Sequence, residues 1–102
     1  MARKLTNMKP AADKTEPGSL LGKTVVLDTS GPITYLGTLH AITKDGFILK
    51  DADFRDRTEG HVTKEAYVWE AHENGIRANR RRVFVFKHVV ISISALDDVL
   101  AE

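Results

Sequence analysis

The sequence VFVFKHVVISIS, residues 83–94, contains two apolar runs separated by the basic pair Lys87–His88. Because side chains alternate across a strand, the two valines of VFVF face one side and its two phenylalanines face the other. The wall of a small barrel needs only one apolar face, so the second apolar face requires a cover. We therefore expect two strands joined by a tight turn at Lys87–His88, with an apolar surface that another element or another subunit buries.

Turn residues divide most of the chain into short apolar segments. The five segments that predict strands are KTVVLDT (23–29), ITYLGTLHAIT (33–43), FILKDADF (47–54), RRRVFVF (80–86) and VVISIS (89–94). Gly37, inside the second segment, predicts a bulge or sharp bend of the kind that curls a small sheet into a barrel. The sequence Asp45–Gly46 predicts a hairpin turn with positive φ. In the third segment we expect Phe47, Leu49 and Asp51 on one side of the strand.

The segment between the third and fourth strands, about residues 55–80, has no strand pattern, and within it TKEAYVWEAHENGI (63–76) fits two structures. The signals for a helix are an N-cap, an acidic first turn, an apolar stripe and a C-terminal stop: Thr63, Glu65, then Tyr67, Val68 and Ala71, then Asn74–Gly75 with Ile76. As a hairpin, the segment would use Asn74–Gly75 as a type I′ turn. We favour the helix because alanine and glutamate are poor strand residues.

Together these segments predict a mainly β fold, a small and strongly bent five-stranded antiparallel barrel with a helical insertion between strands three and four. Residues 1–18 show no periodicity, and we expect a mobile N-terminal arm followed by one domain at 19–102. The final segment SALDDVLAE (94–102) predicts the start of a short helix with Ser94 as its cap.

The composition excludes several classes of protein. The chain of 102 residues has no cysteine, so disulfides, thiolate chemistry and cysteine-based zinc sites are excluded. No apolar run approaches the roughly 20 residues that cross a bilayer, and the charged N-terminus lacks the apolar core of a secretory signal. We expect a soluble, cytoplasmic protein.

Charge is unevenly distributed although the formal net charge is only +1. Residues 45–73 contain eight acidic residues and four lysines or arginines. Residues 77–87 contain five basic residues, Arg77, Arg80, Arg81, Arg82 and Lys87, and no acidic residue. The overall charge does not demand a nucleic-acid partner, but a local basic stripe permits one.

Two covers are possible for the second apolar face of strands four and five. A neighbouring subunit can pair with an open edge strand, and a head-to-tail contact of this kind closes into a ring when the rotation permits. Alternatively, the inserted helix with Tyr67 and Trp69 covers the face within one chain, which leaves a monomer or dimer. The side chains expected at a subunit interface are Val83, Phe84, Val85, Phe86, Val90 and Ile91.

These segments resemble the Sm-like superfamily, whose domain is a bent five-stranded barrel. Residues 21–54 look like the first half of such a domain, since they share YLGTL with its central glycine, a short hairpin and GFILKDA. The sequence FKH, followed by apolar residues and serine, is similar to the Tyr-Lys-His-Ala-Ile-Ser signature of Hfq-type members. The resemblance covers about residues 20–99 and is interrupted over 55–82, where Hfq-type proteins have only a few residues. The chain therefore looks like a separate bacterial branch with an enlarged loop.

The resemblance implies a homo-oligomeric ring that binds RNA without catalysis or cofactor, with Lys87 and His88 facing the pore. Lysine neutralises phosphate, and histidine donates to a base or stacks on it. Two features depart from the superfamily's patterns. No asparagine occurs at residues 43–47, and Phe86–Lys87 stands where eukaryal and archaeal members have Arg-Gly. Hfq-type members have an aromatic residue near the base pocket, where ungapped spacing places Asp45, with Phe47 close by.

Other interpretations of these residues stay open. Arg80, Arg81 and Arg82 either contact phosphates or pair with the acids of DADFRDRTE (51–59). Lys87 and His88 are also ordinary residues for an exposed turn. The competing function is a structural or protein-interaction module of the same fold, which has lost the RNA pocket and docks a partner through the inserted helix.

An enzyme has little support from the sequence. No phosphate-binding glycine loop, nucleophile elbow or cysteine nucleophile is present. Only His61 and Glu65 approach the spacing of metal ligands on a helix, which is a weak signal. We expect no catalytic residue and no metal site.

Overall fold

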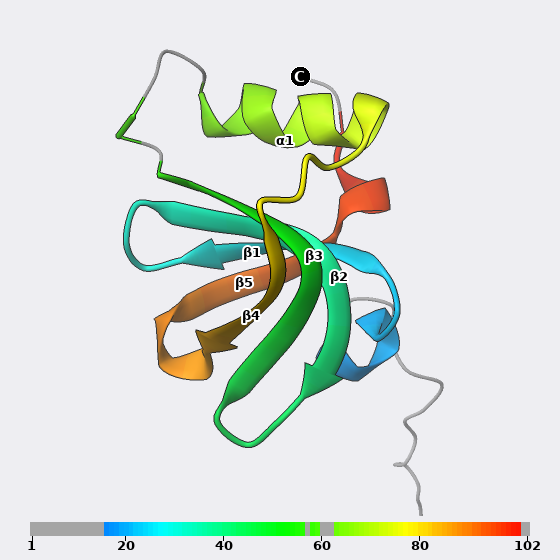
Figure 1. Ribbon diagram of the computed structural model, residues 1–102, viewed down its shortest axis with the longest axis vertical. Coiled ribbons are helices and arrows are strands. Elements are labelled where there is room, and N and C mark those ends of the chain that lie inside the picture. Colours follow the sequence, from blue (N-terminus) through cyan, green and yellow to red (C-terminus); the bar gives the residue numbers. More distant parts are fainter. Residues whose placement is uncertain (1–15, 57, 60–62, 101–102) are drawn as a thin grey trace, which may run out of the picture.

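The computed structural model describes residues 16–56, 58–59 and 63–100 (Figure 1). Its elements in chain order are η2 (Pro17–Leu20), β1 (Thr24–Thr29), β2 (Ile33–Ile42), β3 (Gly46–Asp56), α1 (Lys64–Asn74), β4 (Arg80–Phe86), η3 (Lys87–Val89), β5 (Val90–Ala95) and η4 (Leu96–Asp98), where η denotes a 3-10 turn. The expected mainly β fold with five antiparallel strands and a helix between strands three and four is confirmed. No helix in the described ranges has the length and apolar character needed to span a membrane.

The five strands form one antiparallel sheet in the order β4-β3-β2-β1-β5. The sheet curls strongly, so that both its ends bend around one side (Figure 1). β4 and β5 follow each other in the chain but lie at opposite edges of the sheet, connected by η3. The expected tight turn at Lys87–His88 is present, but the two strands that it joins do not pair, so it is not the turn of a hairpin. The turn is a corner between the two free edges.

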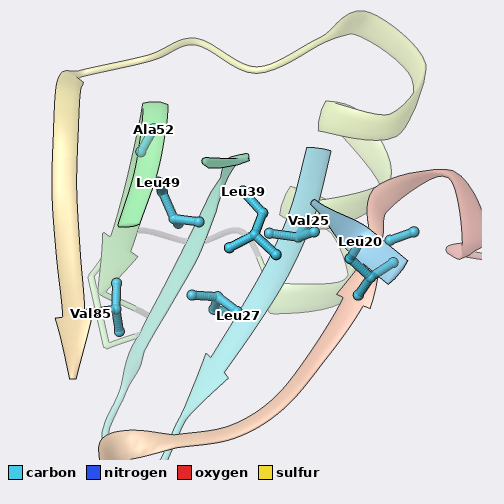
Figure 2. Packing of buried hydrophobic residues seen from close by; sticks show 8 residues of the cluster. Leu20, Val25, Leu27, Leu39, Leu49, Ala52 and Val85 are labelled. Atoms are coloured by element: carbon cyan, nitrogen blue, oxygen red, sulfur yellow. The ribbon is translucent and has the colours of Figure 1, made fainter. Parts of the chain in front are cut away.

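The concave side of the sheet holds the main hydrophobic core (Figure 2). Its buried members come from all five strands and from η2: Leu20, Val25, Leu27, Leu39, Leu49, Ala52, Val85 and Ala95. Leu27, Leu39 and Leu49 are completely inaccessible to solvent. Each fully buried leucine contributes about 1.5–3 kcal/mol to the stability of the fold by leaving water, so the burial of these three side chains stabilises the curled sheet.

The bend expected at Gly37 is confirmed by the register of β2 and β3. Leu36 pairs with Asp53 and Thr38 pairs with Lys50, so one residue of β2 faces two of β3 in a β-bulge. A Cβ atom on Gly37 would lie only 3.0 Å from the Cβ of Ala52, which explains why glycine allows this close approach.

The extra residue in the bulge of β3 is Asp51, with a left-handed φ of 50°. The expectation that Asp51 continues the inward face of Phe47 and Leu49 is wrong. The bulge turns its side chain to solvent and brings Ala52 into the core instead.

The β2–β3 turn is closed by a side chain. Thr43 Oγ1 accepts hydrogen bonds from the backbone N–H groups of Asp45 and Gly46, both at 3.1 Å. The positive φ expected for Gly46 is not found, since the described glycines with positive φ are Gly22 and Gly75. Gly46 is required for space, because a Cβ there would overlap the carbonyl oxygen of Val85 in β4.

The inserted segment forms the helix α1, so the hairpin alternative is excluded. Thr63 caps it by accepting a 3.1 Å hydrogen bond from the N–H of Ala66, and Gly75 ends it with φ of 88°. Its buried residues are the expected stripe of Tyr67, Val68 and Ala71. They pack in a second cluster with Val26, Leu36 and Leu96, and Ile76 lies against this cluster.

Helix α1 therefore lies on the convex side of the sheet, over β1 and β2 (Figure 1). It does not cover the outward face of β4 among the described residues, where Phe84 and Phe86 remain 37% and 55% exposed. The alternative that the inserted helix buries this face within one chain is wrong.

The two ends of the domain depart from expectation in part. Residues 1–15 of the expected arm lie outside the described residues, whereas Pro17–Leu20 forms η2 and buries Leu20 in the main core. At the other end, Ser94 is a strand residue paired with Val26, so it caps no helix. The chain continues as the 3-10 turn η4, which starts after Ala95 and buries Leu96.

Candidate nucleic-acid interface

The corner at Lys87–His88 is held between two hairpin turns. The N–H of Lys87 donates a 2.9 Å hydrogen bond to the carbonyl oxygen of Asp45, in the β2–β3 turn. On the other side, the N–H of Ser30, in the β1–β2 turn, donates a 2.8 Å hydrogen bond to the carbonyl oxygen of Val89. These two bonds fix the backbone of η3, while the side chains of Lys87 and His88 are exposed. The corner thus presents two exposed polar side chains on a backbone held by hydrogen bonds on both sides.

The structure brings Asp45 to the same corner as Lys87, as the sequence spacing suggested. Asp45 is exposed, and its backbone is bonded to that of Lys87. Its carboxylate adds negative charge at this corner, which opposes phosphate binding.

The aromatic side chain that lies at the corner is Phe86. Its ring centroid lies 5.9 Å from that of the His88 ring, with the planes tilted by 47°. Phe47 pairs with Val85, is partly buried and packs against the main core. An exposed aromatic ring beside an imidazole offers a base a stacking surface, and Phe86 provides one while Phe47 points inward. From the sequence, Phe86 was expected only at a subunit interface. Val85 is buried in the core, and because side chains alternate along a strand, Phe86 points outward at the corner.

The three consecutive arginines lie at the far end of β4. Arg80 and Arg82 pair with Ala52 and Lys50 of β3, whereas Phe86 pairs with Gly46 beside the corner. From Arg82 to Lys87 the backbone advances by about 16 Å, at about 3.3 Å per strand residue. The arginines and the corner therefore do not form one pocket. They mark the two ends of one basic edge strand.

Arg80 has a defined position, whereas its neighbours extend into solvent. Its guanidinium carbon lies 4.6 Å from the centroid of the Phe54 ring, and its Nη1 donates a 3.0 Å hydrogen bond to the carbonyl oxygen of Asn79. Arg81 and Arg82 are exposed. Within the described residues the ion pairs are Lys64–Asp28 and His72–Glu73, so no arginine of β4 pairs with an acid there. These cations remain available to an anionic ligand.

The base of the insertion is tied to β3 by the carboxylate of Asp53. Tyr67 donates a 2.7 Å hydrogen bond to Asp53 Oδ2, and the side-chain amide of Asn79 donates a 2.8 Å bond to Oδ1. The guanidinium carbon of Arg55 lies 5.1 Å from the centroid of the Tyr67 ring. Burial of the Tyr67 hydroxyl, together with its bond to the Asp53 carboxylate, raises the pKa of Tyr67 well above its ordinary value. These contacts hold α1 on the sheet and fix Asn79, the residue that precedes β4.

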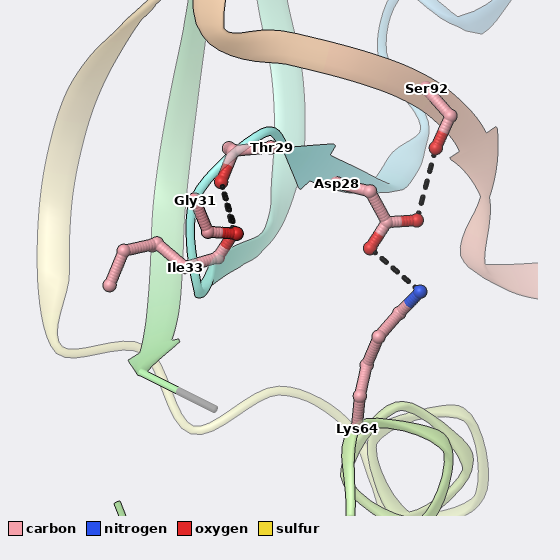
Figure 3. Close-up of polar contacts among 6 residues, drawn as sticks. All are labelled: Asp28, Thr29, Gly31, Ile33, Lys64 and Ser92. Carbon is pink, nitrogen blue, oxygen red and sulfur yellow. Dashed lines mark hydrogen bonds and ion pairs between the residues drawn. The ribbon is translucent and has the colours of Figure 1, made fainter. Parts of the chain in front are cut away.

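A second contact fixes the start of α1 to β1 (Figure 3). Lys64 Nζ lies 3.0 Å from Asp28 Oδ1, and Ser92 of β5 donates a 3.0 Å hydrogen bond to Asp28 Oδ2. Next to Asp28, Thr29 Oγ1 donates a 2.6 Å hydrogen bond to the carbonyl oxygen of Ile33, which closes the β1–β2 turn. Both ends of the insertion are thus bonded to the sheet.

The six residues expected at a subunit interface fall into two groups. Val85 is buried in the core of its own chain, and Val83 and Val90 pack against that core. Phe84, Phe86 and Ile91 are exposed, with Ile91 reaching 69%. Because β4 and β5 are the two free edges of the sheet, these three side chains lie where another chain could add a strand. His61, considered as a metal ligand with Glu65, lies outside the described residues.

Comparison with known proteins supports the fold. No family model matches the sequence, and no curated protein matches it either. A solved structure of an Sm protein of Pyrococcus abyssii in complex with a uridine heptamer aligns with a TM-score of 0.51 and 15% identity, covering 76% of this chain and 89% of that one. A novel Sm-like archaeal protein from Pyrobaculum aerophilum aligns with a TM-score of 0.49 and 20% identity over 76% of this chain. The present chain spans 46% of the length of that second protein. The chain described here has an Sm-like fold.

Proposed function

We propose that the chain assembles into a homo-oligomeric ring and binds RNA at the Lys87–His88 corner without catalysing a reaction. The observation that carries the proposal is the corner itself. In an Sm-like fold, an exposed lysine, an exposed imidazole and the ring of Phe86 lie together on a backbone fixed by two hairpin turns. The Pyrococcus abyssii protein of similar fold was solved with a uridine heptamer, so a uridine-rich strand is the first ligand to test.

Each group at the corner has a distinct role in this proposal. The Lys87 ammonium neutralises a phosphate, and the His88 ring donates to a uracil carbonyl or stacks on the base. The arginines at the start of β4 add contacts to phosphates of the bound RNA strand where it leaves the corner. A ring carries one such corner in each subunit. An RNA strand bound at one corner is held at high effective concentration near the other corners, so the ring binds it more tightly than a single subunit does.

Binding of a uridine-rich oligonucleotide at several salt concentrations tests the proposal. We expect affinity to fall as salt increases, with a slope that reports the number of phosphates neutralised. The double substitution Lys87→Ala and His88→Ala should weaken binding by about tenfold or more, whereas Lys23→Ala with His40→Ala, which removes an exposed lysine and an exposed histidine elsewhere, should not. Equal binding by the two double variants would contradict the assigned site.

A protein-interaction module of the same fold is the second candidate. It is favoured by the Asp45 carboxylate at the corner, which opposes phosphate, and by the inserted helix, whose outward side chains are exposed. The same titration separates the two candidates, since a protein module shows no salt-dependent affinity for the oligonucleotide at low salt.

A further inference from the structure

A groove of about 510 Å³ lies between the N-terminal half of α1 and the convex face of β1 and β5. Its apolar lining consists of Val26, Ala66, Val68, Trp69, Val99 and Leu100. Leu100 is 85% exposed, which is the greatest exposure among the large apolar residues of the described chain. The ring of Trp69 stacks on His72 with centroids 4.7 Å apart, so the indole has a fixed position in the groove wall. The groove is thus preformed and has room for an aromatic side chain.

A second apolar feature lies at the opposite edge of the sheet. Phe84 and Phe86 point outward from β4 and contact each other edge to face, with centroids 4.9 Å apart. Their exposed fractions are 37% and 55%. Side chains on a strand alternate, and Val83 and Val85 point into the main core, so the two phenylalanines lie on the convex side of the sheet. The pair projects from the edge strand and no described element covers it.

The groove and the phenylalanine pair lie on the same face of the sheet. Val26 belongs to the cluster beneath α1 and pairs with Ser94 of β5, so Ser94 shares that convex face. Ser94 also lines the groove, which therefore reaches the β5 edge. A chain that adds its β4 to this edge places its backbone about 4.8 Å from that of β5, so an aromatic side chain on its outward face can reach the groove.

We propose that the Phe84–Phe86 pair of one copy seats in the groove between α1 and β5 of the next copy. This inference rests on the proposed ring and specifies how the insertion takes part in it. The pair and the groove lie at opposite edges of one sheet, so one copy offers the pair to one neighbour and the groove to another, which is a head-to-tail contact. The inserted helix then forms half of each subunit contact.

The chemistry of the groove favours a second copy over RNA as its occupant. Most of its lining is apolar, and its basic residue Lys64 is already paired with Asp28 at 3.0 Å. Glu65 adds a carboxylate to the lining, which repels phosphate. An uncharged aromatic pair meets no such penalty and buries apolar surface on both sides.

Trp69 is the sole tryptophan of the chain and lines the groove, so its fluorescence reports whether the groove is covered. In a dilution series of the full chain, we expect the emission of Trp69 to shift to shorter wavelength as the mass measured by light scattering rises. Phe84→Ala with Phe86→Ala should weaken self-association by about tenfold or more and remove the shift. Leu100→Glu, at the other half of the contact, should do the same because it places a charge in the groove. Leu21→Ala, at a side chain 48% exposed elsewhere, is the matched control and should change neither.

The two measurements separate the failure of this contact from the failure of the ring. A particle of monomer mass at all concentrations overturns both proposals. A multimer that dissociates on dilution without any change in Trp69 emission, or whose mass is unchanged in the Leu100→Glu variant, overturns the groove contact and leaves the ring standing. An emission shift that appears only with added oligonucleotide assigns the groove to RNA and likewise overturns the contact.

Discussion

Replacing Gly46 by alanine tests how the corner is built. Gly46 starts β3 and pairs with Phe86 at the end of β4. A Cβ at this position would overlap the carbonyl oxygen of Val85 and lie 3.0 Å from both Phe84 Cζ and the Cα of Phe86. Two of these three neighbours are backbone atoms, so a change of rotamer cannot relieve the overlap. The two strands must separate locally.

The expected cost follows from this geometry. Overpacking in a well-packed region costs about 1–3 kcal/mol. Displacing the end of β4 also weakens the bond from the N–H of Lys87 to the carbonyl of Asp45, and a hydrogen bond contributes about 1 kcal/mol net. We therefore expect Gly46→Ala to lower the free energy of unfolding by about 2–4 kcal/mol. For a domain of this size, each kcal/mol shifts the Tm by about 4–8 °C, so a decrease of roughly 8–32 °C should be seen.

Thermal unfolding followed by circular dichroism measures this effect, with Gly31→Ala as control. Gly31 has ordinary φ and no atom within 4 Å of an added Cβ, so its substitution should leave the Tm within a few degrees of the parent. The substitution at Gly46 should also weaken oligonucleotide binding, because the same displacement moves Lys87. If the two alanine variants unfold at the same temperature, β3 and β4 do not pack at the corner as described, and the argument for a rigid site is refuted.

Two further predictions concern the attachment of the insertion. Tyr67→Phe removes the hydroxyl that donates to Asp53 and should cost about 1 kcal/mol. Because the pKa of Tyr67 is raised in the folded chain, its contribution to stability is full below its ordinary value of 10.0 and is lost as the pH rises further, so denaturant titrations at pH 9 to 11 should show a loss in the parent that the phenylalanine variant lacks. Thr63→Ala removes the N-cap of α1 and should cost about 1 kcal/mol, with faster amide hydrogen exchange confined to α1, whereas faster exchange across all strands would contradict a local role.

The elements that the sequence predicts correctly are those with local signals. Thr63 and Gly75 mark the ends of α1 because an N-cap hydroxyl and a residue with positive φ act within one helical turn. Gly37 predicts the bend of β2 because a mid-strand glycine lacks a side chain at the point where another strand approaches. Such signals require no knowledge of which strands become neighbours.

The features that the sequence did not predict depend on contacts between distant segments. Two apolar runs joined by a short polar turn are compatible with a hairpin and with a corner. Only the pairing of β5 with β1 and of β4 with β3 decides between them. The reason for Gly46 is equally non-local, since its neighbour is the backbone of β4, about 40 residues further along the chain. The sequence Asp45–Gly46 suggested that glycine is needed there for a positive φ. In the structure, glycine is needed because a side chain would overlap the backbone of β4.

The candidate site shows the same division. The turn at Lys87–His88 has a local signal and was predicted, and spacing placed Asp45 beside it, whereas the binding of RNA by these residues stays a prediction. Which aromatic ring faces the corner depends on which alternate residues of β4 point into the core, and the burial of Val85 decides this. Because Val85 points inward, Phe84 and Phe86 point outward. The ring of Phe86 lies near that of His88, and the ring of Phe84 lies near that of Phe86.

The uncovered face of β4 would gain free energy from being buried in the proposed subunit contact. Burying one phenylalanine side chain contributes about 1.5–3 kcal/mol. The exposed parts of Phe84 (37%) and Phe86 (55%) together amount to about one side chain, so covering both would contribute about that much. Helix α1 covers the convex face over β1 and β2 but stops short of β4, and the groove at its N-terminal half opens toward β5 instead. One insertion therefore completes the core of its own chain with Tyr67, Val68 and Ala71, and leaves Trp69 at a surface suited to the aromatic pair of another copy.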